Sequence, residues 1–233
     1  MYVSKRKVSA FLLLLLSPCI AELLSSSSPP LEFFQPLTFL ANAELEKAQH
    51  MIVWGLIDKC MRLRVAILVE DYFDERELIY PLYRFKEAGA EVDLLAPKAG
   101  EYHGKNGFPL KISKTVSPEL AEEYDVVWIP GGYAPDRLRR SRDVLEFVRR
   151  MYELGKIVTA VCHGPWVLIS AGIIKGRKVT AFYSIHDDVK NAGAELVGER
   201  AVRDGNLITG TDPEAMPDMV KLIFEALKEY GIA

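Results

Sequence analysis

Three short, mostly apolar runs constrain the fold of this chain more than any other feature. They span residues 63–69, 125–129 and 157–161. Runs of this length that lack polar alternation are typical of strands covered on both faces, as in a parallel sheet. Helical spacing of apolar residues follows at 77–86 and 143–154. The alternation predicts an α/β fold in which a mainly parallel sheet lies between two layers of helices.

The other segments extend the same pattern. Residues 102–112, with Asn106-Gly107 in the middle, are expected to form a hairpin excursion. Asp204-Gly205 is a two-residue turn signal between two short strands. Further strands are predicted at 91–96, 178–182, 195–197, 201–203 and 206–209, and further helices at 119–123, 166–171, 185–192 and 213–230.

The ends of the three apolar strands should converge. Val69, Ile129 and Val161 are each followed by a polar or glycine-rich turn. In open parallel sheets ligands bind at the carboxyl ends of the strands, so the sequence predicts a site there.

Cys162 comes directly after the third of these strands and before Gly164-Pro165 and an apolar helix. Ala160 and Gly164 supply the steric clearance that a sharp strand-to-helix turn needs, as in a nucleophile elbow. A helix N-terminus next to the sulfur would favour the thiolate. The alternative interpretation of Cys162 is a buried structural cysteine, which is the usual role of a free thiol.

The composition limits the partners, the compartment and the source that we expect for this protein. The formal charge of −3 gives no support for binding to nucleic acid. Three scattered cysteines, at positions 19, 60 and 162, do not make a disulfide framework, and a lone thiol suits a reducing compartment. From Met61 onward the chain has no glutamine, three asparagines and many charged residues, which indicates a heat-adapted source.

The first sixty residues are distinct from the rest. A basic start, a short apolar run and a small residue near Ala21 are typical of a secretory signal peptide. Either the protein is exported, or residues 1–60 are a non-native extension and the working domain is 61–233. The second interpretation is favoured because the first convincing strand begins just after Met61, and it predicts a cytoplasmic protein.

Four groups of residues resemble the ThiJ/PfpI family, and most closely its archaeal branch of intracellular cysteine peptidases, also described as protein deglycases. The resemblance covers residues 61–233 and implies a flavodoxin-like three-layer sandwich. It is carried by Glu77-Leu78-Ile79-Tyr80-Pro81, Ile129-Pro130-Gly131-Gly132-Tyr133-Ala134-Pro135, Cys162-His163-Gly164-Pro165 and Asp187-Asp188.

The resemblance implies roles for five residues. Cys162 would be the nucleophile and His163 its acid/base partner, while a protonated Glu77 would contact the sulfur and keep its pKa low. Backbone N–H groups around Gly131, Gly132 and His163 would form an oxyanion hole. Without the resemblance, Glu77 is better explained as a charge that complements the helix dipole, and the two glycines are equally well explained by a tight turn.

Two positions depart from the family pattern. Where the archaeal branch has a glutamate that reaches the histidine of a neighbouring subunit, this chain has Asp136, which is also a plausible helix-start residue. Phe182 replaces a tyrosine that commonly lines the site. The resemblance implies a homo-oligomer, a dimer or hexamer, with Asp136 acting across an interface. Tyr72, Arg76 and Tyr133 are candidates for the mouth of the pocket.

Several kinds of site are not expected. No histidine has metal-ligand spacing with a cysteine or carboxylate pair, so we predict no metal and no cofactor. Neither the loop with Gly131-Gly132 nor the turn with Gly164 matches a phosphate-binding pattern. A class I glutamine amidotransferase would have a His-Pro-Glu motif downstream of the cysteine, and His186-Asp187-Asp188 does not match it.

Two functions follow. The first is a cysteine hydrolase that attacks carbonyl or amide groups of small carbonyl compounds, peptides or glycated proteins, with peptidase, deglycase or glyoxalase activity. The alternative is a non-catalytic oxidative-stress sensor or chaperone in which Cys162 is oxidised to a sulfinate next to Glu77. No nucleic-acid partner is expected in either case.

Overall fold

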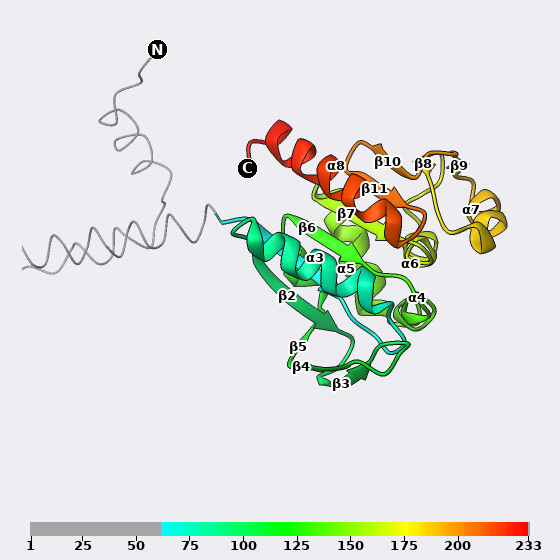
Figure 1. Cartoon of the computed structure of the whole chain (residues 1–233). Helices are drawn as coiled ribbons and strands as arrows, with labels where there is room; N and C mark the ends of the chain where they lie inside the picture. The colour runs from blue at the N-terminus through cyan, green and yellow to red at the C-terminus, as the bar shows by residue number, and fades with distance from the viewer. Residues whose placement is uncertain (1–61, 233) are drawn as a thin grey trace, which may run out of the picture. The chain divides into compact units, whose positions relative to one another are not determined.

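The main sheet has seven strands, as seen in a computed structural model that describes residues 62–232 (Figure 1). The strand order is β10-β11-β7-β6-β1-β2-β5, and every pairing is parallel except that of β10 with β11. The predicted mainly parallel sheet is therefore confirmed. The strands are β1 (Arg64–Leu68), β2 (Glu91–Ala96), β5 (Lys114–Thr115), β6 (Val126–Ile129), β7 (Ile157–Val161), β10 (Ala201–Asp204) and β11 (Leu207–Gly210).

Two small sheets and a set of helices complete the domain. β3 (Gly100–His103) pairs with β4 (Pro109–Ile112) as the expected hairpin, and β8 (Lys178–Val179) pairs with β9 (Glu195–Leu196). The α-helices are α3 (Glu75–Glu87), α4 (Ala134–Leu138), α5 (Arg142–Glu153), α6 (Pro165–Ala171), α7 (His186–Asn191) and α8 (Met216–Glu229), and the 3-10 helices are η2 (Pro118–Glu122), η3 (Tyr183–Ile185) and η4 (Pro213–Ala215).

The sheet divides the core into two layers because successive strand residues point to opposite faces. On one face, Val127 and Ile129 of β6 pack into a cluster with α5 and α6. On the other face, Val126 and Trp128 belong to a cluster with α3 and α8 (Figure 1). All four residues of β6 are fully buried, which explains why this strand has no polar alternation.

Helix α3 begins at a well-defined cap. The Asp74 side chain accepts a hydrogen bond from the backbone N–H of Arg76, which satisfies one of the free donors of the first turn. Gly89 follows the helix with φ of +83°, a conformation that favours glycine and stops the helix. The cap fixes where the first turn lies, and Glu77 is part of that turn.

The predicted strand at 178–182 is only partly correct. Only Lys178–Val179 pairs as a strand, and the following residues leave the ladder. Their backbone donors are satisfied elsewhere: the Thr180 N–H donates to Thr209 Oγ1 at 2.9 Å, and the Phe182 N–H donates to the Cys162 carbonyl at 3.1 Å. The segment therefore runs past the end of β7 toward Cys162. Sequence reasoning missed β5, and the helix expected at 119–123 is the 3-10 helix η2.

Several predictions fall on residues 1–61, outside the part that the structure describes. They include the signal-like segment and the 60/61 domain boundary, and the cysteines at positions 19 and 60 also lie there. Within residues 62–232, no helix combines the length and the apolar character needed to cross a bilayer.

Trp128 links the core to the first turn of α3, and its loss gives a test of this packing. The buried indole Nε1 donates to the Glu77 carbonyl at 2.8 Å, and the ring meets Phe85 edge-on with centroids 6.3 Å apart. Trp128→Phe leaves that carbonyl without its partner, so the free energy of unfolding should fall by about 1–3 kcal/mol in urea titrations. Tyr83→Phe, at a residue that is 64% exposed, is the control. Equal stability of the two variants would contradict the role of this bond.

Candidate active site

The carboxyl ends of β1, β6 and β7 lie side by side, as predicted. β6 pairs with β1 on one side and with β7 on the other. Beyond the strands, Phe73 forms an isolated bridge with Gly132, and the Tyr133 N–H donates to the Tyr72 carbonyl at 2.9 Å. The turns after β1 and β6 are thus joined next to the turn that carries Cys162.

Cys162 sits on a strained elbow. Its φ of +59° is in the left-handed region, which costs a non-glycine residue on the order of 1–3 kcal/mol. The conformation is held by backbone bonds: the Cys162 N–H donates to the Gly210 carbonyl at 3.0 Å, and the Gly164 N–H donates to the Val161 carbonyl at 2.7 Å. A Cβ on Gly164 would lie 2.8 Å from the carbonyl oxygens of Ile129 and Val161, so the predicted need for a small residue there is met.

Glu77 lies beneath this elbow and is fully buried. Its Oε2 accepts the backbone N–H of Gly131 at 2.6 Å. A Cβ on Gly131 would lie 2.6 Å from Oε2, 2.7 Å from Cys162 Cβ and 3.1 Å from the His163 nitrogen. Only glycine lets these three groups approach one another.

Burial and the nearby charge of Asp74 raise the pKa of Glu77 to about 7, and the Gly131 N–H opposes this rise. Oε1 has no hydrogen-bond partner among the described residues. The neighbouring Cys162 side chain also opposes the rise in the pKa of Glu77. Near neutral pH the carboxyl is poised between its protonated and charged forms.

The surroundings of Cys162 oppose the expected low pKa of its thiol. Burial of the sulfur, followed by the charge of Glu77, raises the pKa of the Cys162 thiol to about 12. The N–H groups of Gly132 and His163 act in the opposite direction. The thiol is therefore the stable form of the unliganded site, and a base must remove its proton during a reaction.

His163 is in place to be that base. Its Nδ1 lies 3.2 Å from Cys162 Sγ and its Nε2 lies 3.0 Å from Ser184 Oγ. The imidazole contacts Trp166 and Phe182, with ring centroids 5.0 Å and 5.2 Å away. Burial, together with the positive charge of Lys105, lowers the pKa of His163 below 6.5, so the ring is neutral at pH 7.

The structure corrects one part of the predicted oxyanion hole. The Gly131 N–H is used by Glu77, so it is not a free donor. Gly132 has φ of +71°, and a Cβ there would lie 2.4 Å from the Tyr72 carbonyl oxygen. Its N–H and that of His163 act on the Cys162 sulfur, which leaves these two groups as the donors near the nucleophile.

Within one chain, Asp136 does not reach His163. It belongs to α4, its side chain is 56% exposed, and it pairs with Arg140 at 2.9 Å. Its action across a subunit interface stays a prediction.

The predicted mouth residues are spread over different environments. Tyr72 has φ of +65° and lies under the Arg137 guanidinium, 5.0 Å from its ring centroid. Tyr133 is 68% exposed, and Arg76 pairs with the buried Asp74 at 3.0 Å. Phe182 packs against His163, so the position that departs from the family pattern does contact the site.

Sequence reasoning missed three supporting contacts. Ser184 lies in η3, and Asp188 fixes Trp166 by accepting its indole N–H at 2.8 Å. Asp74 also accepts Lys105 Nζ at 2.5 Å, which docks the β3–β4 turn on the start of α3. The Asp187-Asp188 pair was visible in the sequence, but no local pattern connects it or Ser184 with His163.

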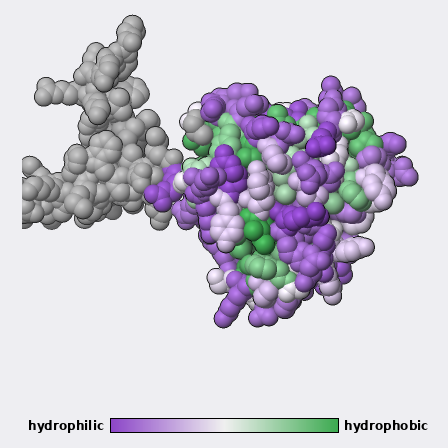
Figure 2. Space-filling view, viewed as in Figure 1, coloured by the Kyte–Doolittle hydropathy of each residue, from purple (hydrophilic) through white to green (hydrophobic). Residues whose placement is uncertain are grey.

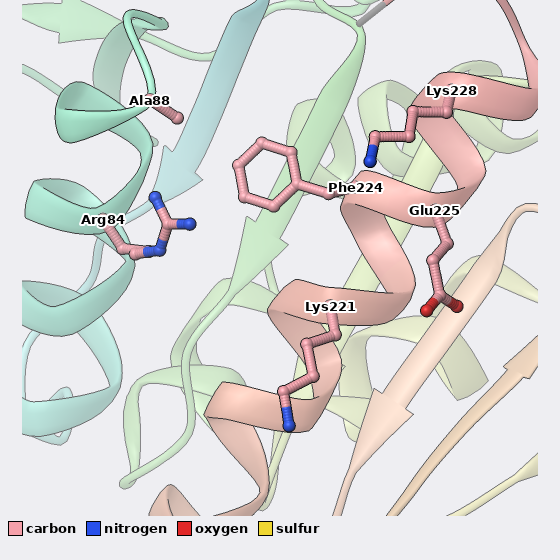
Figure 3. A pocket seen from close by; sticks show the side chains of 6 residues that line it. All are labelled: Arg84, Ala88, Lys221, Phe224, Glu225 and Lys228. Atoms are coloured by element: carbon pink, nitrogen blue, oxygen red, sulfur yellow. The ribbon is translucent and has the colours of Figure 1, made fainter.

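No group of three or more metal-ligating side chains occurs in residues 62–232. The surface over α3 and α8 is mainly hydrophilic with small apolar areas (Figure 2). A shallow depression of about 470 Å³ lies there, where Arg84 faces Phe224 with 5.0 Å between guanidinium and ring centroid (Figure 3). It contains none of the predicted site residues, so the geometry around Cys162 locates the chemistry better than this depression does.

Comparison with known proteins shows which family the chain belongs to. The model of the DJ-1/PfpI family matches residues 63–226. The chain belongs to the DJ-1/PfpI family. A deglycase of Thermococcus kodakarensis is 41% identical over 165 residues, which cover 69% of this chain and 99% of the relative. A protein/nucleic acid deglycase of Escherichia coli is 39% identical over 174 residues, covering 73% and 99%.

Solved structures give the same fold. A two-domain protein from Anabaena variabilis with a DJ-1/ThiJ/PfpI-like domain superposes with a TM-score of 0.68 at 39% identity; the match covers 73% of this chain and 48% of that protein. Schizosaccharomyces pombe DJ-1 superposes with a TM-score of 0.64 at 24% identity, covering 70% and 91%. The predicted flavodoxin-like fold is confirmed. The name of the Escherichia coli relative removes the support for excluding nucleic acid as a substrate.

The charge of Asp74 should stabilise the fold above its unfolded pKa. Hydrogen bonds from Arg76 and Lys105 lower the pKa of this buried carboxyl from 3.8 to about 2. A depressed folded pKa gives stability that is present above pH 4 and lost as the pH falls toward 2. Asp74→Asn keeps a capping side chain, so its deficit of about 2 kcal/mol at pH 5 should vanish near pH 2 in urea unfolding. Asp218→Asn, exposed on α8, should show a small difference at every pH.

Glu77 should raise, not lower, the pKa of Cys162. In Glu77→Gln the carboxylate charge is gone, so the pH midpoint for iodoacetamide alkylation of Cys162 should shift down by about one unit or more. Peptide mapping by mass spectrometry measures the rate at this thiol alone. Glu75→Gln changes the same chemistry in the same helical turn and is the matched control. Slower alkylation of Glu77→Gln would mean instead that the carboxyl donates to the thiolate, as the resemblance implies.

Proposed function

We propose that this protein is a cysteine hydrolase of the deglycase and peptidase type, with Cys162 as its nucleophile. The observation that carries the proposal is the 3.2 Å approach of His163 Nδ1 to Cys162 Sγ on a strained elbow. Backbone strain of this kind is typical of sites where a side chain must be held in one orientation. Deglycase names among relatives that match over nearly their whole length support the same reaction class.

In the first step the thiol is deprotonated as it reacts. His163 is neutral at pH 7 and takes the Sγ proton on Nδ1 while sulfur attacks the substrate carbonyl carbon. The electron pair of the C=O bond moves to oxygen. The N–H groups of Gly132 and His163 are the donors that stabilise this oxyanion.

In the second step the intermediate collapses. The C–N bond of a peptide amide breaks and the leaving nitrogen receives the proton that His163 holds. A glyoxal has no leaving nitrogen, so its hemithioacetal oxygen takes that proton, and a hydrogen shift from the attacked carbon to the neighbouring carbonyl carbon gives the thioester. Water then attacks the carbon bound to sulfur, with His163 again accepting a proton, and the Cys162 thiol is restored. Glu77 contributes by its protonation state: in its protonated form it removes the negative charge that opposes a developing thiolate.

The proposed substrates are carbonyl compounds whose reacting group can reach Cys162, which is 8% exposed: small glyoxals, peptides, glycated proteins and glycated nucleic acid. We also propose that residues 61–233 are the working domain, that the protein acts in a reducing cytoplasm, and that it assembles as a homo-oligomer. Intact mass of the native protein and light scattering test the first and last of these points.

A substrate panel on the full chain tests the function. Peptide amides, methylglyoxal, and methylglyoxal-treated protein and oligonucleotide are offered to wild type, Cys162→Ser and His163→Ala. At least one substrate should be turned over, with a loss of at least about 100-fold in each variant. Cys60→Ser is the matched control for loss of a thiol. Full turnover by Cys162→Ser would end the enzymatic interpretation.

One observation favours the alternative sensor function. Glu77 is fully buried, has an unpartnered Oε1 and is half protonated near pH 7, so it can donate to a sulfinate on Cys162. Peroxide treatment followed by intact mass separates the two functions. A sensor gains two oxygens at Cys162 equally well in His163→Ala, whereas the hydrolase needs His163 for turnover.

A further inference from the structure

The second nitrogen of His163 has a partner in its own chain. Nε2 lies 3.0 Å from Ser184 Oγ, while Nδ1 lies 3.2 Å from Cys162 Sγ. A histidine that works as a base needs a second contact that fixes its ring and its tautomer, and a carboxylate often provides it. Here a hydroxyl is in that place.

The positions of the protons on the imidazole ring, before and after transfer, are consistent with a serine hydroxyl next to Nε2. To accept the thiol proton, Nδ1 must be bare, so the neutral ring carries its proton on Nε2 and donates it to Ser184 Oγ. After transfer both nitrogens carry protons, and Oγ still accepts from Nε2. The same hydroxyl therefore serves the ring before and after the proton moves.

The position of Ser184 relative to the nucleophile is set by backbone contacts. The Phe182 N–H donates to the carbonyl of Cys162 at 3.1 Å, so the segment leading into η3 is tied to the nucleophilic residue itself. Within η3, the Ile185 N–H donates to the Phe182 carbonyl at 3.1 Å, and the Ile185 side chain is buried. Ser184 lies between these two anchored residues.

The ring itself is held by aromatic contacts. Phe182 and Trp166 both lie about 5 Å from the imidazole, measured between centroids, and Asp188 fixes the Trp166 indole by a 2.8 Å hydrogen bond. The imidazole is thereby kept with one nitrogen toward Sγ and the other toward Ser184.

We propose that Ser184 is the positioning residue of His163, so that Cys162, His163 and Ser184 form a complete array within one chain. The inference rests on the proposed cysteine hydrolase function. It makes the neighbouring subunit's carboxylate unnecessary for orienting the ring, in agreement with the pairing of Asp136 with Arg140 in the same helix region.

A hydroxyl also changes how the base behaves. It stabilises an imidazolium less than a carboxylate does, because hydrogen bonds to charged acceptors are stronger. Three other charged groups act on the site. Lys105 of the β3–β4 turn disfavours the cation, Glu77 of α3 is poised between its charged and protonated forms near neutral pH, and Asp74 acts on Glu77. A proton taken from Cys162 is therefore readily passed on to the leaving group.

The experiment compares Ser184→Ala, Ser184→Thr and Asp136→Asn in the full chain, on the substrate turned over best by wild type. Ser184→Ala should lower kcat about tenfold with KM within about twofold, because one hydrogen bond that orients the base is lost. Ser184→Thr keeps the hydroxyl and should restore most of kcat. Ser113→Ala, an exposed serine between β4 and β5, is the matched control and should match wild type.

A spectroscopic readout keeps the test independent of turnover. In ¹⁵N spectra wild-type His163 should show the tautomer protonated on Nε2, and Ser184→Ala should show a mixture of tautomers. If the ¹⁵N pattern of Ser184→Ala equals that of wild type, the proposal is overturned. It is also overturned if Asp136→Asn abolishes turnover while Ser184→Ala retains it. Absence of any wild-type turnover would instead count against the proposed function, and the ¹⁵N result alone would then decide on Ser184.

Discussion

The approach of three chain segments at Gly131 is the constraint on which the site depends. Glu77 Oε2 receives the Gly131 N–H at 2.6 Å, and a side chain at this glycine would overlap Glu77 and Cys162. The contact joins the first turn of α3, the turn after β6 and the elbow after β7. It also consumes a backbone donor that would otherwise be free to bind an oxyanion. The buried carboxyl is thus held by the same loop that faces the nucleophile.

Electrostatics in this small volume work against a preformed thiolate. Burial and the Glu77 charge both favour the thiol of Cys162, while burial and Lys105 both favour neutral His163. The resting site therefore holds an uncharged Cys–His pair, with the carboxyl beneath it near its own midpoint. Such a site keeps the sulfur unreactive until a carbonyl group is bound and the proton has a place to go. This property suits a hydrolase better than a sensor that depends on a standing thiolate.

The aromatic and polar residues around His163 hold the imidazole in position. Asp188 holds Trp166, Trp166 and Phe182 hold the imidazole, and Ser184 contacts its far nitrogen. Asp74 anchors both the start of α3 and Lys105 of the hairpin. Long-range contacts thus support each reacting group, and the strain at Cys162 is maintained by the surrounding fold.

The sequence by itself determined the sheet, the elbow and the candidate Cys162, because strand burial and tight turns leave local patterns in composition and spacing. It also carried the motifs of the family, and only this resemblance made His163 and Glu77 candidates. Only the tertiary structure decided that Gly131 donates to Glu77, that the segment after β8 leaves its ladder, and that Ser184 meets His163. Those contacts join residues 21 to 54 positions apart or depend on a hydrogen bond to a distant carbonyl, and no local pattern encodes them. Only the tertiary structure also decided that the pKa of Cys162 is raised, since burial and neighbouring charge exist only once the chain is folded.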